Sequence, residues 1–471
     1  MENMSQAASD KDQEFRDRLG IVSKEGKRNW IYPKKPKGKY YRARTMVSIV
    51  LLLFFFGAPF LRYKGNPVFL INAVDRKFII LGTIFGPHDF FLLLLSMIAL
   101  VLFIFLFTTI FGRVFCGWVC PQTVFMEMVF RKIEYLIEGD ASRQRQLNKS
   151  RWTAEKIMRK GLKNVIFFVL SFLVANTFLA WVIGTGELYR IVSDPPVEHL
   201  TGLISITAFS LAFYGVFAWF REQACILVCP YGRLQGVLLD ENSLVIAYDY
   251  TRGEPRGKLK KSEVKTEKGD CVDCHMCVDV CPTGIDIRNG TQLECINCTA
   301  CIDACDMVME KTSRPKGLIR YASLKGIREK KGFRFTERVV FYSSVIMILI
   351  VVIAYLLLTR TDFDVSFLRT PGLLSQEQAG GRISNIYDLK VTNKTFTDTP
   401  MKLKLEFEDG EIKVIGYDNL ISKAQSITET KVLVTLGEKK LKGLITPLKI
   451  SVYAGDKKVD EVKTSFLGKV D

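Results

Sequence analysis

Five long runs of uncharged, mainly apolar residues divide this chain, and polar segments separate them. A helix that crosses the hydrocarbon core of a bilayer needs about 20 residues, within a range of about 17 to 25. All five runs have that length, although the first only just has it. One such run could be a buried core helix, but five together predict an integral membrane protein. The runs are Thr45–Leu61, Phe90–Phe111, Asn164–Gly186, Leu200–Phe220 and Val339–Thr359.

The pattern changes after Thr361, where apolar and polar residues alternate in short segments separated by Asp-Gly, Gly-Glu and Gly-Asp turns. Period-two alternation with closely spaced turns is typical of a small β-sandwich. This part contains no His, no Cys and no nucleophile motif, so a docking or stabilising role is expected for it. The predicted strands include Met401–Glu406, Ile412–Ile415, Lys431–Thr435 and Leu448–Tyr453.

A further amphipathic segment, Thr123–Ile137, mixes aromatic and aliphatic residues with charges. This mixture favours a helix that lies on the inner surface of the membrane.

Charge adds an orientation to this picture. The 471 residues carry a net charge of +17, and 48% of them are hydrophobic. The basic residues cluster beside the apolar runs, which indicates membrane topology rather than binding of nucleic acid. Nine Lys or Arg residues lie between Lys24 and Arg44, so the N-terminus is expected in the cytoplasm. Five spans then place the C-terminal part outside, and the localisation expected is the bacterial inner (cytoplasmic) membrane, with lipid as a partner.

Eight of the twelve cysteines form two copies of C-x2-C-x2-C-x3-C between the fourth and fifth runs. This is the bacterial ferredoxin spacing for a pair of [4Fe–4S] clusters, in which the fourth cysteine of each copy binds the other cluster. One cluster is therefore expected on Cys271, Cys274, Cys277 and Cys305, and the other on Cys295, Cys298, Cys301 and Cys281. Zinc sites or a disulfide scaffold are the alternatives, although zinc knuckles rarely repeat this spacing twice.

The other four cysteines form two C-x3-C-P motifs, Cys116/Cys120 and Cys225/Cys229, whose equivalent cysteines are 109 residues apart. Each motif follows a pair of apolar runs, which indicates an internal repeat of two helical hairpins. The proline fits a helix that stops or kinks after the second cysteine. Four soft thiolates could hold Cu(I), zinc or an iron–sulfur centre, or could act as redox thiols. Packing at helix ends is the non-functional alternative.

The predicted topology puts all twelve cysteines on the reducing side of the membrane or at its edge, while the outer tail has none. Free thiols and clusters persist in a reducing cytoplasm and not in an oxidising compartment, so the two arguments agree.

Five regions follow from these patterns: a basic cytoplasmic tail (1–44), a four-span region with both C-x3-C-P motifs (45–241), an inserted α+β two-cluster ferredoxin domain (242–324), a basic linker with the fifth helix (325–360) and an extracytoplasmic β-sandwich (361–471). The fold class is thus a multi-domain integral membrane protein with an α-helical bundle of five spans.

The order of these parts resembles the FixG/RdxA/CcoG family of bacterial accessory proteins for cbb3-type cytochrome c oxidase. The resemblance implies an Ig-like fold for the outer tail and a role in maturing the oxidase. It further implies a membrane cupric reductase that supplies Cu(I), with copper or redox work at Cys116, Cys120, Cys225 and Cys229. Oxidase assembly factors or copper transporters are the partners implied, and the cytoplasmic electron donor is unknown.

Two other functions remain open at this point. One is a quinol-linked electron-transfer subunit for a partner reductase. The other is a non-enzymatic copper carrier or assembly scaffold in which the clusters are structural.

Overall fold

The structure is a computed structural model that describes residues 25, 27–63, 65–72, 77–86, 89–258, 268–330, 336–372, 375–378, 381–407, 409–417, 419–438, 441 and 443–468. The polar tail predicted at the start of the chain lies outside the described residues. The chain divides into two compact units, residues 1–60 with 95–350 and residues 61–94 with 351–471. Each unit is described below by itself.

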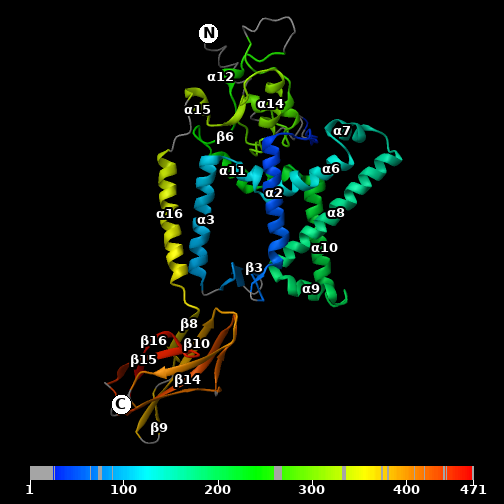
Figure 1. Cartoon of the computed structure of the whole chain (residues 1–471). Helices are drawn as coiled ribbons and strands as arrows, with labels where there is room; N and C mark the ends of the chain where they lie inside the picture. Colours follow the sequence, from blue (N-terminus) through cyan, green and yellow to red (C-terminus); the bar gives the residue numbers. More distant parts are fainter. Residues whose placement is uncertain are drawn as a thin grey trace. The chain divides into compact units, whose positions relative to one another are not determined.

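Five helices among the described residues are long and apolar enough to cross a membrane, which confirms the five predicted spans (Figure 1). Four of them start and end within a few residues of the predicted limits. The spans are α2 (Lys39–Gly57) with its short continuation η1 (Ala58–Phe60), α3 (Phe90–Phe111), α8 (Ala154–Ile183), α10 (Leu200–Gly215) with η4 (Val216–Phe220), and α16 (Glu337–Leu358).

The third span is the exception, because α8 begins ten residues before the apolar run that predicted it. Thr153 caps its N-terminus, and its side-chain oxygen accepts a hydrogen bond from the backbone N–H of Lys156. The first turns carry charged residues with good helix propensity, and two of them, Lys156 and Lys163, are buried against the protein. The apolar run therefore marks only the part of the helix that can face lipid.

Short helices connect the spans and carry the C-x3-C-P motifs. Between the second and third spans they are α4 (Val114–Trp118), α5 (Pro121–Thr123), η3 (Val124–Phe130), α6 (Arg131–Ile137) and α7 (Ala141–Lys149). Between the third and fourth spans lies α9 (Thr185–Ser193), and after the fourth come η5 (Ala224–Val228) and α11 (Pro230–Leu238).

The amphipathic segment Thr123–Ile137 is helical, as predicted, but protein covers most of its apolar residues; Leu136 near its end is exposed. Its apolar residues pack against the third and fourth spans in one hydrophobic cluster. Phe130 is fully buried, and its ring stacks on that of Phe217 with 4.5 Å between centroids. A periodic apolar face predicts that something covers a helix, not whether protein or lipid does so.

The segment with the eight clustered cysteines folds around a two-stranded antiparallel sheet, β6 (Val245–Tyr248) paired with β7 (Ile319–Ala322). The elements around it are α12 (Tyr250–Gly253), α13 (Met276–Asp279), η6 (Ile287–Asn289), α14 (Ala300–Lys311) and α15 (Leu324–Glu329). Isoleucines from the sheet, η6 and α14 pack with the cysteines in one core.

This segment belongs to the same compact unit as the first four spans. Figure 1 shows α14 at the N-terminal end of α2, where the buried carboxylate of Asp303 accepts hydrogen bonds from the backbone N–H groups of Tyr40 and Tyr41. These N–H groups have no partner inside α2, so Asp303 satisfies them. The first span is thereby attached to the helix that carries Cys301 and Cys305.

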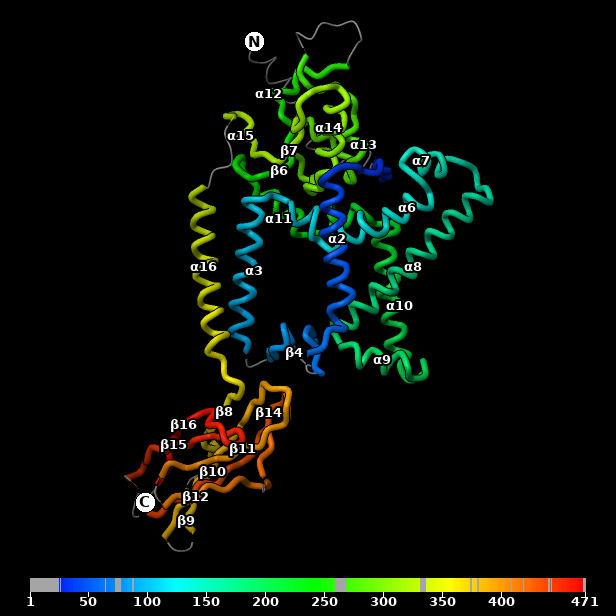
Figure 2. Tube along the Cα trace, viewed as in Figure 1, coloured from blue at the N-terminus to red at the C-terminus, as the bar shows by residue number. Residues whose placement is uncertain are grey.

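Apart from the ends of α3 and α16 that it includes, the second unit consists mainly of strands. Its N-terminal part has a hairpin, β1 (Arg62–Tyr63) with β2 (Asn66–Pro67), and a three-stranded sheet of β3 (Phe69–Asn72), β4 (Lys77–Ile80) and β5 (Thr83–Phe85). Its C-terminal part has two antiparallel sheets (Figure 2), in the orders β12-β14-β10-β8, with β9 beside β10, and β13-β11-β15-β16. These strands are β8 (Phe363–Arg369), β9 (Gln376–Gln378), β10 (Arg382–Asn393), β11 (Thr399–Leu405), β12 (Gly410–Val414), β13 (Leu420–Ser422), β14 (Ile427–Gly437), β15 (Ile445–Ala454) and β16 (Lys457–Leu467).

The predicted β-sandwich is confirmed, since the four strands foreseen after Thr361 correspond to β11, β12, β14 and β15. The inward residues of both sheets form one core. The sequence analysis did not name β10, in which burial alternates from Tyr387 to Val391 but polar Ser384, Asn385 and Asn393 are buried as well.

Candidate functional site

The first predicted group of cluster cysteines comes together where α13 and α14 pack against each other. Cys271 and Cys274 lie in the loop before α13, Cys277 lies in α13 and Cys305 in α14. The thiol of Cys305 is within electrostatic range of the first three of the four thiols in the first cysteine run. The fold thus brings Cys305 to the run that precedes it, as the crossed pairing requires.

The second group is arranged in the same way. The thiol of Cys301 is within electrostatic range of Cys298, Cys295 and Cys281, and Cys281 is the fourth cysteine of the first run. Cys277 of the first group is the next thiol in range. The two groups are therefore neighbours, and each takes one cysteine from the other run.

Both cysteine runs have the same backbone conformation. Asp273 and His275 in the first run have φ of 51° and 56°, and Asn297 and Thr299 in the second have φ of 53° and 67°. Each pair occupies equivalent positions on either side of the second cysteine. Left-handed residues beside right-handed ones turn successive backbone N–H groups toward one concave face, a geometry common at iron–sulfur sites. Non-glycine residues rarely adopt this conformation, so its repetition supports a built cofactor site.

The thiols themselves also fit metal ligation. All twelve cysteines are free, so the structure contains no disulfide scaffold. Burial raises the pKa of Cys277, Cys295 and Cys305 to about 12 and that of Cys298 to about 11. A buried thiol gives up its proton readily only to a metal, because thiolate is the ligand. The donor set, its convergence and the repeated loop geometry fit two [4Fe–4S] clusters.

The four remaining cysteines also come together. Cys116 lies in α4 and Cys225 in η5, while Cys120 and Cys229 stand immediately before α5 and α11. The thiol of Cys225 is within electrostatic range of the other three. We refer to Cys116, Cys120, Cys225 and Cys229 as the four-cysteine site.

The two halves of this site are local repeats in structure as well as in sequence. Cys120 has φ −57° and ψ 125°, Cys229 has φ −66° and ψ 112°, and each is followed by a proline that begins a new helix. Gly112 and Arg221, again 109 residues apart, have φ of 58° and 55°. The second and fourth spans thus both end in a sharp backbone turn. The first cysteine of the motif follows on a short helix, and that helix ends just before the second cysteine.

The four-cysteine site packs directly on the second cluster group. Gly117 makes this approach possible, because a Cβ atom at that position would lie 2.4 Å from the carbonyl oxygen of Ile296. Cys116 contacts the hydrophobic cluster that contains Ile296 and Cys298. Any side chain larger than that of Gly117 would separate the two groups of cysteines.

Polar neighbours of the four-cysteine site are few. The buried amide of Gln235 donates a hydrogen bond of 3.3 Å to the Sγ atom of Cys116. A cavity of about 20 Å³, enough for about one water molecule, is lined by Cys225 and by Pro282 and Thr283, which follow Cys281. Burial raises the pKa of Cys116 to about 11 and that of Cys225 to about 12.

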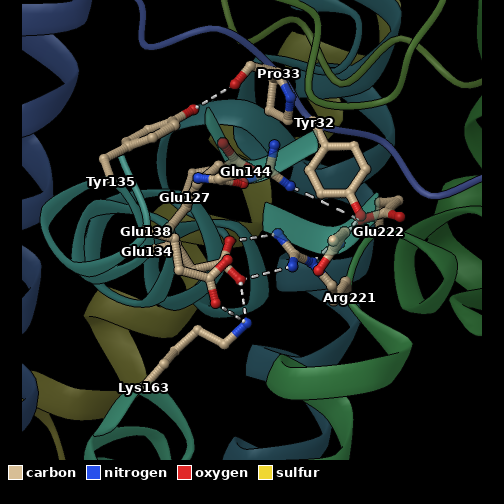
Figure 3. Close-up of polar contacts among 12 residues, drawn as sticks. Tyr32, Pro33, Glu127, Glu134, Tyr135, Glu138, Gln144, Lys163, Arg221 and Glu222 are labelled. Atoms are coloured by element: carbon tan, nitrogen blue, oxygen red, sulfur yellow. Dashed lines mark hydrogen bonds and ion pairs between the residues drawn. The ribbon is translucent and has the colours of Figure 1, made fainter. Parts of the chain in front are cut away.

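A network of buried ion pairs adjoins the same cavity, and the sequence analysis missed it. Arg221 donates two hydrogen bonds of 2.8 Å to Glu134, and Lys163 lies 2.9 Å from Glu138 (Figure 3). Although burial by itself would raise the pKa of Glu134, the cations around it, first Arg221 and then Lys163, hold that pKa below its usual range.

A sequence signal for this network exists. Its acidic and basic residues on η3 and α6 recur three or four positions apart, which places them on one face of a helix. The residues are Glu127, Arg131, Glu134 and Glu138. Arg131 and Glu134 are almost completely buried, and Arg131 lies 3.3 Å from Glu127 and 3.7 Å from Glu222.

Three protein-family models match the chain. A 4Fe-4S dicluster domain matches residues 220–324, a 4Fe-4S binding domain matches residues 93–139, and an Ig-like fold found at the C-terminus of FixG matches residues 353–469. The second of these matches includes Cys116 and Cys120.

Curated relatives extend over most of the chain. Protein RdxB of Cereibacter sphaeroides is 36% identical over 391 residues, which is 78% of this chain and 80% of that protein. Protein RdxA of the same organism is 35% identical over 408 residues, 81% of this chain and 83% of that protein. The nitrogen fixation protein FixG of Rhizobium meliloti is 35% identical over 312 residues, 63% of this chain and 58% of that protein.

These matches agree with the five spans, the converging cysteine groups and the C-terminal sandwich. The individual ligands of each cluster and the role of the four-cysteine site stay predictions. The chain belongs to the FixG/RdxA family of iron–sulfur membrane proteins with an electron-transfer function.

Proposed function

We propose that this chain is a membrane cupric reductase that converts Cu(II) to Cu(I) at the four-cysteine site. One observation carries the proposal: four soft thiols converge in one place, and that place adjoins the second cluster group at Gly117 and Ile296. Soft thiolates favour Cu(I), so the same ligands would promote the reduction and retain its product.

In this proposal the clusters, when bound, supply one-electron carriers. The electron would come from a reduced cytoplasmic carrier protein. It would travel by way of the two cluster-binding groups to the four-cysteine site and reduce one Cu(II) ion to Cu(I) there. The chain itself holds the copper. The thiols of Cys116 and Cys225 would lose their protons only when copper binds, since burial raises the pKa of both.

The proposed orientation has the N-terminus and both cluster groups in the cytoplasm and the sandwich outside. The basic residues before the first span support this assignment. Cu(I) formed at the inner membrane would be passed to copper transporters or to factors that assemble cbb3-type cytochrome c oxidase. The β-sandwich offers a docking surface for such partners.

The test uses the full chain, purified without oxygen in detergent. The protein is reduced with dithionite, freed of excess reductant and mixed with Cu(II) and bicinchoninate, which absorbs light when it binds Cu(I). Protein that was not reduced beforehand measures the Cu(I) made by thiol oxidation alone. We expect Cu(I) in proportion to the stored electrons, and we expect Cys116→Ser and Cys229→Ser to lose it while retaining about eight irons. The proposal would be overturned if the reduced clusters did not reduce Cu(II). It would also be overturned if the serine variants produced as much Cu(I) as the wild type.

A second candidate rests on the match of a 4Fe-4S binding domain to residues 93–139, which include Cys116 and Cys120. In that case the four-cysteine site holds a third cluster, and the protein passes electrons from quinol to a partner reductase. The iron count separates the two: about twelve irons per chain for three clusters, against about eight for two. Loss of about four irons in Cys116→Ser would favour this candidate.

A further inference from the structure

Arg113 connects the chain segments that carry both groups of metal-binding cysteines. It stands at the N-terminus of α4, three residues before Cys116. Its guanidinium donates hydrogen bonds to the backbone carbonyls of Leu293 and Gly232. Leu293 precedes the cluster ligand Cys295 by two residues, and Gly232 follows Cys229 by three. One side chain therefore joins α4, α11 and the loop that enters the second cysteine run.

The charge of Arg113 is buried without an ion pair. Its side chain is 6% exposed, its Nε atom is buried and has no hydrogen-bond partner, and among the described residues no carboxylate lies within ion-pair distance of it. A buried charge that has no counter-charge is strongly destabilising, because its lost hydration is not compensated. A buried cation is therefore expected to have an anionic neighbour of some kind.

Three of the four groups that act on the charge of Arg113 are thiols, and the fourth is the carboxylate of Glu294. Burial lowers the pKa of Arg113, and Cys116, Cys295, Glu294 and Cys229 act in the opposite direction, with Cys116 and Cys295 the strongest of them. Two of these thiols belong to the four-cysteine site and one to the second cluster group. They become anionic when they bind metal, because thiolate is the ligand. Metal loading therefore adds anionic charge beside Arg113 to that of the Glu294 carboxylate.

We propose that Arg113 is a positioning residue that couples the second cluster to the four-cysteine site through its charge. A fixed positive charge stabilises whichever neighbour becomes more negative, so it favours reduction of the cluster on Cys295 and binding of metal by Cys116 and Cys229. The part that concerns copper rests on the function proposed above. The part that concerns the cluster does not depend on it.

The test compares Arg113→Gln, which removes the charge and keeps hydrogen-bond donors, with Arg113→Lys, which keeps the charge. Both variants are titrated with dithionite and redox mediators, and the reduced clusters are followed by electron paramagnetic resonance. In Arg113→Gln we expect reduction of one cluster to become at least about tenfold less favourable, a shift of about 59 mV for one electron. The other cluster should stay within about twofold of wild type, and Arg113→Lys should retain most of the wild-type value.

Arg159→Gln is the matched control. Arg159 also donates a hydrogen bond to a backbone carbonyl, that of Ile137, but its ion-pair partner is the carboxylate of Glu155 and not a thiol. We expect it to leave both reduction steps unchanged. Iron content is measured in every variant, because a purely structural role would lower iron equally in Arg113→Gln and Arg113→Lys.

Equal losses of iron in both variants would overturn the proposal, and so would unchanged reduction of both clusters in Arg113→Gln. The affinity for Cu(I), measured by competition with bicinchoninate, should fall about tenfold in Arg113→Gln. If copper is not the substrate, the wild type fails the copper assay while the shift in cluster reduction remains. If Arg113 has no coupling role, the wild type reduces copper and the shift is absent.

Discussion

Arg221 donates two hydrogen bonds of 2.8 Å to the buried carboxylate of Glu134, while its own backbone has φ 55° and ψ −123°. This conformation is ordinarily adopted by glycine and typically costs about 1–3 kcal/mol for other residues. The bidentate pair holds Arg221 at the turn between the fourth span and the helix of Cys225. Glu134, on the separate helix α6, thus fixes the position of this turn and balances the charge of Arg221.

Because of this ion pair, we expect Glu134→Gln to lower the stability of the folded chain strongly. The substitution leaves Arg221 and Lys163 as buried cations without a full counter-charge, and we expect a loss of about 3–5 kcal/mol in unfolding free energy. Chemical unfolding in a mild detergent measures it. Glu155→Gln is the control, since Glu155 pairs with Arg159 at 2.9 Å but is 59% exposed, and a change below about 1 kcal/mol is expected there.

The same carboxyl group gives a pH dependence with a definite sign. Because its pKa is held below the usual value in the folded chain, its contribution is fully present above about pH 4.3, the value in an unfolded chain. The contribution is lost as the pH falls through the lower folded pKa. The stability difference between wild type and Glu134→Gln should therefore shrink in acid and stay constant between pH 6 and 8. A difference that grows on acidification would contradict this.

Gly117→Ala should disturb the contact between the four-cysteine site and the second cluster. Its Cβ atom would lie 2.4 Å from the carbonyl oxygen of Ile296, so the loop that carries Cys295 and Cys298 must move. We expect loss of up to about four irons, one cluster, with the other retained. Gly161→Ala is a matched control, because nothing lies within 4 Å of a Cβ atom there. Equal iron contents in the two variants would argue against the close approach.

The crossed pairing of cysteines can be tested with double variants. Cys281→Ser and Cys298→Ser should remove ligands from the same cluster, so the double variant should keep about four irons, as each single variant does. Cys281→Ser combined with Cys274→Ser should damage both clusters and leave few irons. If instead the first pair loses nearly all iron and the second keeps half, each run binds its own cluster.

Metal binding at the four-cysteine site should release protons. Burial raises the pKa of Cys116 to about 11 and of Cys225 to about 12, so both thiols are protonated in the metal-free protein near neutral pH. The affinity for Cu(I) should then rise at least about tenfold from pH 7 to pH 8, after correction for the competing ligand. Cys116→Ser should reduce this slope by one proton. An affinity independent of pH would mean that the thiols are already ionised.

The sequence predicted the five spans, because length and lack of charge alone decide whether a helix can cross a membrane. It also predicted the groups of cysteines, whose spacing reflects the shape of the cofactor. In the structure Cys305 lies near the first cysteine run, and Cys116 lies near Cys225. Both placements are consistent with those predictions.

The sequence did not reveal what surrounds these groups. Arg113 and Glu134 resemble ordinary charged residues at a membrane edge, and only their tertiary neighbours show that they are buried. Gly117 stands in the motif as an unremarkable small residue until Ile296 is placed against it. Periodicity indicates one face of an element, whereas the partner on that face comes from a distant segment: Arg221 lies 87 residues from Glu134 in the sequence.

The matching turns at Gly112 and Arg221 bear on the history of the two hairpins. If the halves arose by duplication, the copies diverged at a position where glycine has little cost and arginine has a large one. In this structure the arginine at that turn is held by the carboxylate of Glu134 on α6. The two hairpins are therefore not interchangeable, because the second depends on Glu134, which lies outside it. If the second hairpin were moved alone into another protein, Arg221 would keep its strained backbone and lose the carboxylate that stabilises it.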